Sequence, residues 1–300
     1  MRLLLLCVMF LGLSCASEEP SPPLPSTEFS VTTMGDITDR RISEISGMAR
    51  STLHEGILWV LNDSGDNAHI YAISQNGDIR ATVSIYGVQN YDWEDLSSFN
   101  MDGESYLLIA DIGGNVVFRD VFHLYVIKEP MLEATTAPVV WKLSFEYDNG
   151  ARDAEAVAVD TAQEKILLLS KRDVPALLYE LPLRPQTSEL LIAQQLGEIT
   201  SIPQPTEDEV QRRLDRYHAQ PTGMDISADG ASIAVLTYRR AFLYERRDNE
   251  SWLQTLNRTP RLFEFPRLEQ AEALCFDEDG TSLYITSEKL PAPLIRLTYP

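Results

Sequence analysis

The chain is poor in cysteine, in basic residues and in long apolar runs, and each shortage excludes a class of protein. Only Cys275 of its 3 cysteines lies beyond residue 15, so the rest of the chain cannot form an intramolecular disulfide. Lys and Arg total 25 against 45 Asp and Glu, a net charge of -20. Such a surface cannot neutralise a phosphate backbone, which excludes nucleic acid as a partner and disfavours anionic lipid surfaces.

The N-terminus carries the longest apolar run, and it is short. Residues 3–13 are apolar, which is too few to span a bilayer but typical of a signal peptide. Gly12-Leu13-Ser14-Cys15 resembles a bacterial lipobox. We therefore expect residues 1–15 to be a signal peptide and Cys15 to be lipidated. Cleavage after Ala16 is the alternative.

The next segment, residues 16–28, is rich in Pro and Ser and predicts a solvated tether. Together these features predict export as an outer-membrane lipoprotein that faces the periplasm or the exterior. The membrane would be contacted only through the lipid anchor. The alternative is a soluble secreted or periplasmic protein.

The remainder, residues 29–300, has the apolar content of one folded domain and contains an internal repeat. Five apolar segments each begin with a polar marker residue, and each is followed by a second apolar segment that ends in another polar marker. The offset between the two markers is 17, 17, 16, 16 and 16 residues. The first markers are Ser46, Glu94, Glu155, Thr222 and Glu272, and the second are Asp63, Asp111, Lys171, Tyr238 and Glu288.

Third and fourth apolar segments follow in most units, which predicts an all-β fold. Four-stranded antiparallel sheets that bury both faces against their neighbours form a β-propeller. We count five blades, with six as the alternative. The fifth unit ends after its third strand, and residues 29–34 alternate like a strand, so an N-terminal strand should close the ring. Thr206-Glu207-Asp208-Glu209 resembles a capping box and predicts a helical insertion over residues 206–219.

Propeller geometry predicts that both sets of markers surround one mouth of the central channel. Crowded carboxylates there must be protonated, neutralised by cations or bound to a metal ion. Oxygen donors favour a divalent cation, of which Ca²⁺ is the leading candidate. The expected ligands are Glu94, Glu155, Glu272, Asp63 and Asp111. Further polar residues expected at this rim are Glu44, Asn62, Asp66, Asn67, Asp92, Asp95, Asn115 and Arg239.

The order of motifs also resembles a known group of proteins. ISGMARS, LWVLNDSGDN, YDWEDL, ADIGGN, DAEAVAVD, TGMDISADG and QAEALCF are similar to those of an uncharacterised bacterial exported β-propeller family near the SdiA-regulated and esterase-like-activity-of-phytase families. The resemblance covers residues 43–298 and implies an exported propeller. Gly114 departs from the family pattern, which has Asp there. More distantly, gluconolactonase-like propellers hold one divalent cation at the channel mouth, a role that this resemblance implies for Glu94, Glu155 and Glu272.

Two functions remain open at this stage. The first is a monomeric binding or scaffold protein of the cell envelope, whose partner is a small molecule or an envelope protein. The second is a metal-dependent hydrolase of a lactone or phosphoester. In that case Asp63 or Asp111 would be the base, and Lys171 or Arg239 would stabilise the developing anion. Serine-hydrolase, zinc-protease and phosphate-loop motifs are absent from the sequence.

Overall fold

The computed structural model describes residues 28–114, 119–184, 190–204 and 219–300. The signal peptide with Cys15, nearly all of the tether, Asn115 and nearly all of the expected helical insertion lie outside these ranges. Among the described residues, no helix has the length and apolarity needed to cross a membrane.

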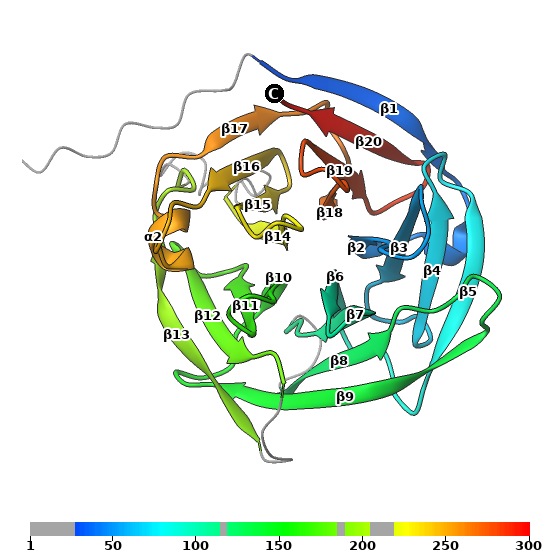
Figure 1. The fold of residues 1–300 in the computed structure, drawn as a ribbon, viewed down its shortest axis with the longest axis horizontal. Coiled ribbons are helices and arrows are strands. Elements are labelled where there is room, and N and C mark those ends of the chain that lie inside the picture. The colour runs from blue at the N-terminus through cyan, green and yellow to red at the C-terminus, as the bar shows by residue number, and fades with distance from the viewer. Residues whose placement is uncertain (1–27, 115–118, 185–189, 205–218) are drawn as a thin grey trace, which may run out of the picture.

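The described strands form antiparallel groups of four that stand around a central axis (Figure 1). The first group contains β2 (Ile45–Arg50), β3 (Ile57–Asn62), β4 (His69–Ser74) and β5 (Ile79–Tyr86). The second contains β6 (Trp93–Met101), β7 (Glu104–Asp111), β8 (Phe122–Lys128) and β9 (Thr136–Tyr147). The third contains β10 (Ala154–Asp160), β11 (Lys165–Ser170), β12 (Ala176–Pro182) and β13 (Leu191–Ile199).

The fourth group contains β14 (Pro221–Ile226), β15 (Ser232–Thr237), β16 (Arg240–Glu245) and β17 (Arg261–Glu264). The last contains β18 (Ala271–Phe276), β19 (Ser282–Ser287), β20 (Ala292–Thr298) and β1 (Ser30–Ile37). The all-β, propeller-like fold agrees with the sequence prediction. A short 3-10 helix, η1 (Arg40–Ile42), and a helix that the sequence analysis missed, α2 (Trp252–Leu256), lie between strands.

The N-terminal strand β1 pairs antiparallel with β20 along its length, from Ser30 opposite Thr298 to Ile37 opposite Ala292. The last group therefore takes its outer strand from the beginning of the chain, as the sequence predicts. Ile37 is fully buried in a cluster between β1–β20 and the first group, with Met34 packed against it. The pairing ties the two ends of the domain together.

Adjacent groups bury both of their faces, which explains why most inner strands are apolar runs rather than alternating patterns. Every residue of β10 is buried, as is every residue of β3. Each hydrophobic cluster lies between two neighbouring groups; one joins Trp59 on β3 to Ile109 on β7, for example. On the periphery, the long strand β9 also pairs in parallel with β5 and with β13, which links three groups.

Polar side chains join neighbouring inner strands around the channel. The Ser46 hydroxyl donates to the Trp93 carbonyl at 2.8 Å, and the Thr222 hydroxyl donates to the Ala271 carbonyl at 2.8 Å. Asp95 is fully buried and accepts from the backbone N–H of Val157 at 2.8 Å. Asp95 therefore lies inside the channel and links β6 to β10, whereas the sequence placed it at the mouth.

Glycine follows Ser46 because the neighbouring inner strand leaves no room for a side chain. A Cβ at Gly47 would lie 2.7 Å from the carbonyl carbon of Asp95. Asp225 makes a link of the same kind as Asp95, since its carboxylate accepts from the backbone N–H of Phe276 on β18 at 2.9 Å. Burial raises the pKa of Asp225 to about 7, although its backbone hydrogen bonds oppose the shift.

We expect removal of the closing strand to destabilise the fold. A chain that begins at Glu28 keeps β1, whereas a chain that begins at Thr38 loses it and leaves the β20 edge unpaired. The longer chain should keep the melting temperature of the full-length protein, and the shorter chain should melt at least 10 °C lower or fail to fold. Equal melting temperatures for the two truncations in thermal unfolding would contradict the closing role.

The Asp225 pKa predicts a pH-dependent stability. Between about pH 4 and 7 the folded protein holds a proton on Asp225 that the unfolded chain lacks, so the free energy of unfolding should fall as pH rises through this range. Asp225→Asn removes this dependence. Urea unfolding at pH 5 and pH 8 should show wild type losing roughly 1–2 kcal/mol more than the variant, a value reduced because Asp225 is partly accessible. Asp229→Asn is the control, because hydrogen bonds lower the pKa of Asp229 and predict no difference there.

Candidate functional site

A cavity of ≈ 560 Å³ opens at the mouth where the inner strands begin and the second strands end. It is lined by eight residues that the sequence placed at this mouth and by six others. The eight are Asp63, Glu94, Glu155, Lys171, Tyr238, Arg239, Glu272 and Glu288. The six are Arg172, Arg267, Leu268, Glu269, Gln270 and Lys289.

A β-bulge at the same place in each inner strand aims the first marker residues. The antiparallel register of β6 with β7 shifts between Trp93 and Asp95, so Glu94 is the extra, unpaired residue. The same shift brackets Glu155 on β10 and Glu272 on β18. A bulge turns one side chain out of the regular alternation. Here it directs three glutamates into one cavity.

The remaining two first markers occupy equivalent bulges but do not line the cavity. Register shifts bracket Ser46 on β2 and Thr222 on β14. Their hydroxyls are short and are used in the links to the next inner strand described above. The first markers are therefore asymmetric: their carboxylates come from the second, third and last groups.

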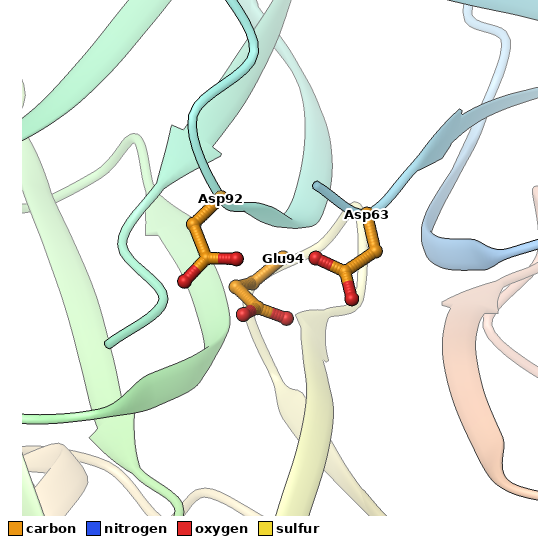
Figure 2. Close-up of side chains that lie close together, drawn as sticks. All are labelled: Asp63, Asp92 and Glu94. Atoms are coloured by element: carbon orange, nitrogen blue, oxygen red, sulfur yellow. The ribbon is translucent and has the colours of Figure 1, made fainter. Parts of the chain in front are cut away.

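Asp63, Asp92 and Glu94 bring one carboxylate oxygen each within 4.8 Å of one another (Figure 2). We call these three residues the oxygen cluster. Asp63 follows β3, whereas Asp92 and Glu94 flank Trp93 at the start of β6. Asp92 and Glu94 are both 3% exposed. A second group with the same spacing, Glu94, Asp153 and Glu155, shares Glu94 with the first.

The oxygen cluster has the chemistry of a divalent-cation site. Within the described residues, Glu94 Oε1 is buried and has no hydrogen-bond partner. Burial raises the pKa of Glu94 well above its usual value, and repulsion from Glu155, Asp63 and Asp92 adds to the rise. A side chain on Gly113 would overlap the carboxylates of Glu94 and Asp92, so glycine keeps this space open. Carboxylate oxygens alone suit a hard cation such as Ca²⁺ or Mg²⁺.

The second group is already partly neutralised by basic side chains. Glu155 Oε1 forms a buried ion pair with Lys171 Nζ, and Asp153 pairs with Arg172. Burial raises the pKa of Glu155 to about 8 even though Lys171 opposes the shift. Burial also lowers the pKa of Lys171, but attraction to Glu155 and Glu272 raises it by more, so Lys171 stays charged. The oxygen cluster is therefore the better cation site of the two.

Glu272 and Glu288 form a carboxyl pair on the other side of the cavity. A side-chain hydrogen bond joins them, and burial followed by this bond raises the pKa of Glu272 well above its usual value. The Tyr238 hydroxyl donates to Glu272 Oε1 at 3.0 Å, and Gln270 Nε2 donates to Glu288 Oε2 at 2.8 Å. The raised pKa favours a proton shared between the two groups, as expected for closely spaced carboxyl groups.

Asp111, which the sequence proposed as a ligand and a base, lies outside the cavity lining. It is fully buried and pairs with Arg119 at 2.6 Å. Its Oδ1 also accepts from the backbone N–H of Asp92 at 3.2 Å, so it positions the loop that carries Asp92. Asn62 and Asp66 bond to each other in the turn after β3. Glu44 and Asn67 lie beside that turn, in a separate surface depression.

The sequence analysis missed Asp153 and assigned no cation to Asp92. A signal for both was present: Asp92-Trp93-Glu94 and Asp153-Ala154-Glu155 repeat Asp-x-Glu at the start of consecutive inner strands. It also missed Arg172, Lys289, Gln270 and Arg267. Arg172 and Lys289 each follow a second marker, as Arg239 does, and Gln270 lies two residues before Glu272; only Arg267 has no place in the repeat. Gln270 and Lys289 both adopt positive φ, 54° and 65°, a strained conformation for residues other than glycine.

No protein-family model matches the chain, and no curated protein matches it in sequence. One solved structure to which the chain is similar is a gluconolactonase from Xanthomonas campestris, described as important in glucose secondary metabolic pathways. The two are 12% identical with a TM-score of 0.45, and the match covers 94% of this chain and 98% of that one. Similarity at this level carries no argument about the cavity.

Cation removal is expected to destabilise the protein. Chelator at pH 7.5 should lower the melting temperature by several degrees, and added Ca²⁺ should restore it, because a ligand at 100 times its Kd stabilises the folded state by about 2.7 kcal/mol. Glu94→Gln should abolish the response. In chelator this variant should melt no lower than wild type, since it removes a buried charge that has no compensating bond.

Glu269→Gln is the matched control for that experiment. Both variants replace one glutamate of the cavity lining by glutamine. Glu269, unlike Glu94, lies outside both groups of clustered oxygens, so it is not expected to contact the cation. The control should respond to chelator and Ca²⁺ as wild type does. A cation response that survives Glu94→Gln, or wild-type protein indifferent to both reagents, would contradict the assignment.

Proposed function

We propose that this protein is a five-bladed β-propeller hydrolase that depends on a divalent cation, with Ca²⁺ as the favoured ion. The observation that carries the proposal is that one cavity contains two different groups of acidic side chains, a candidate cation site and a hydrogen-bonded carboxyl pair. The oxygen cluster can hold a cation, and Glu272 and Glu288 are joined by a hydrogen bond that a protonated carboxyl group must donate. A cation site with a purely structural role would not require the Glu272–Glu288 pair.

The cation would be held by Asp63, Asp92 and Glu94, with Glu155 next to it. When bound, it would act as a Lewis acid that polarises the oxygen of an ester, lactone or phosphoester. The protein's own residues supply the rest. Lys171 is a buried donor that lines the same space, and its Nζ lies 5.2 Å from the centre of the Tyr238 ring. Lys171 would stabilise negative charge that develops on the substrate.

The Glu272–Glu288 pair would transfer the proton. With a raised pKa, Glu272 can donate a proton to the leaving oxygen as the bond from that oxygen to the carbonyl carbon or phosphorus breaks, as a general acid must. A water molecule would form the new bond to the same carbon or phosphorus and lose a proton to Asp63, which lines the same cavity. Glu288 accepts the hydrogen bond that Glu272 donates. After the transfer both carboxyl groups are charged, and a proton from solvent at the open mouth would restore the pair. Gln270 holds Glu288 in place at 2.8 Å.

A turnover assay tests the proposal. Purified protein supplied with Ca²⁺, Mg²⁺ or Mn²⁺ should hydrolyse at least one substrate in a panel of lactones, carboxylic esters and phosphomonoesters, and chelator should abolish the activity. Glu272→Gln should lower kcat by about 10²–10⁴-fold, because it removes the acid and keeps the shape. Its melting temperature should stay close to that of wild type.

Glu264→Gln is the control for activity, since Glu264 pairs with Arg240 on the periphery and does not line the cavity. This variant should keep wild-type kcat. If the protein binds a cation and hydrolyses no substrate in the panel, the hydrolase proposal fails, and the binding or scaffold function becomes the better account of the same cavity.

A further inference from the structure

We call the buried carboxylates Glu94, Glu155 and Glu272 the floor of the cavity, and two arginines that line the same cavity are more exposed. Arg239 and Arg267 both line the cavity. Neither is in an ion pair with any residue of the described chain, although Glu269, Glu272 and Glu288 line the same space. Arg172 and Lys289 lie at the same mouth and are held by Asp153 and Gln270.

The position of Arg239 is built by the fold. Tyr238 and Arg239 form the turn between β15 and β16, where Leu236 is the last residue of β15 paired with β16, opposite Ala241. The Thr237 hydroxyl closes the turn, because it donates to the Arg240 carbonyl at 3.2 Å. Tyr238 is fixed by its bond to Glu272, and the next residue, Arg239, lies at the cavity.

The next residue, Arg240, differs from Arg239 because it forms an ion pair. Arg240 contacts Glu264 on β17 at 3.0 Å and does not line the cavity. In a protein with 45 acidic and 25 basic residues, a guanidinium readily finds a carboxylate. Arg239 and Arg267 line an acidic cavity and form no ion pair with a residue of the described ranges, so both are available to a ligand. Guanidinium groups bind carboxylate and phosphate oxygens in bidentate geometry.

We propose that the cavity recognises its ligand through an anionic group, a phosphate or a carboxylate, which Arg239 and Arg267 bind above the oxygen cluster. The inference rests on the proposed function, because a cation on the floor is what would let an anion approach these carboxylates. Lys171 and the proton shared by Glu272 and Glu288 reduce the floor's negative charge further. The cavity, ≈ 560 Å³, has the size of small-molecule sites. A neutral lactone has no anionic group with which the two guanidinium groups could form an ion pair.

Calorimetric titration with three small molecules, each of which carries one phenyl ring, tests this proposal. Phenylphosphonate carries a phosphate-like group that cannot be hydrolysed, benzoate carries a carboxylate, and benzamide is neutral. With divalent cation present, wild type should bind phenylphosphonate or benzoate at least 10-fold more tightly than benzamide, and the stronger of the two identifies the anion. Arg239→Gln and Arg267→Gln should each weaken that anion by 10-fold or more.

Arg240→Gln is the matched control, adjacent in sequence and identical in charge change, and should bind within twofold of wild type. Benzamide binding as tightly as both anions, or an equal loss in Arg240→Gln and Arg239→Gln, would overturn the proposal. The titration needs no turnover, so the two proposals fail separately. If phenylphosphonate binding depends on Arg239 but no substrate is hydrolysed, only the proposal of hydrolase activity fails. If neutral substrates are hydrolysed and Arg239→Gln does not change their rate, only the proposal of anion recognition fails.

Discussion

Burial of several carboxylates at one mouth of the channel is the constraint on which the rest of the site depends. Closely spaced inner strands bring Glu94, Glu155 and Glu272 into one cavity, where all three are at least 95% buried. Two carboxylates about 4 Å apart repel each other by about 4 kcal/mol at an effective dielectric of 20. The fold tolerates this only because each glutamate has a different source of compensation.

The three sources of compensation divide the cavity into regions with different chemistry. Glu155 is neutralised by Lys171, and Glu272 by a proton shared with Glu288. Within the described residues, Glu94 Oε1 receives neither, and a divalent cation is the remaining way to offset its charge. One repeated residue type thus has three different surroundings, because its neighbours differ: Lys171 beside Glu155, Glu288 beside Glu272, and Asp63 and Asp92 beside Glu94.

The network around the mouth holds these groups in place without occupying the cavity. Asp111 and Arg119 position the backbone of Asp92, and Ser46 and Thr222 tie adjacent inner strands together. The strained residues Gln270 and Lys289 are bonded to each other at the rim. Backbone strain of this kind persists where the surroundings over-determine it, and it is concentrated at functional sites. Pre-organised donors of this kind are what electrostatic catalysis requires.

The sequence by itself determined the all-β fold, the order of the strands, the closing strand and the location of an acidic mouth. These follow from local apolar runs and from a repeat with nearly constant offsets, both of which can be read along the chain. Tertiary structure alone decided which carboxylates meet. A bulge of one residue redirects Glu94 into the cavity, an ion pair with Arg119 keeps Asp111 out of the cavity lining, and the turn after β15 places Arg239 at the cavity. Those outcomes depend on partners distant in sequence, and no local pattern encodes the direction of a side chain at a bulge.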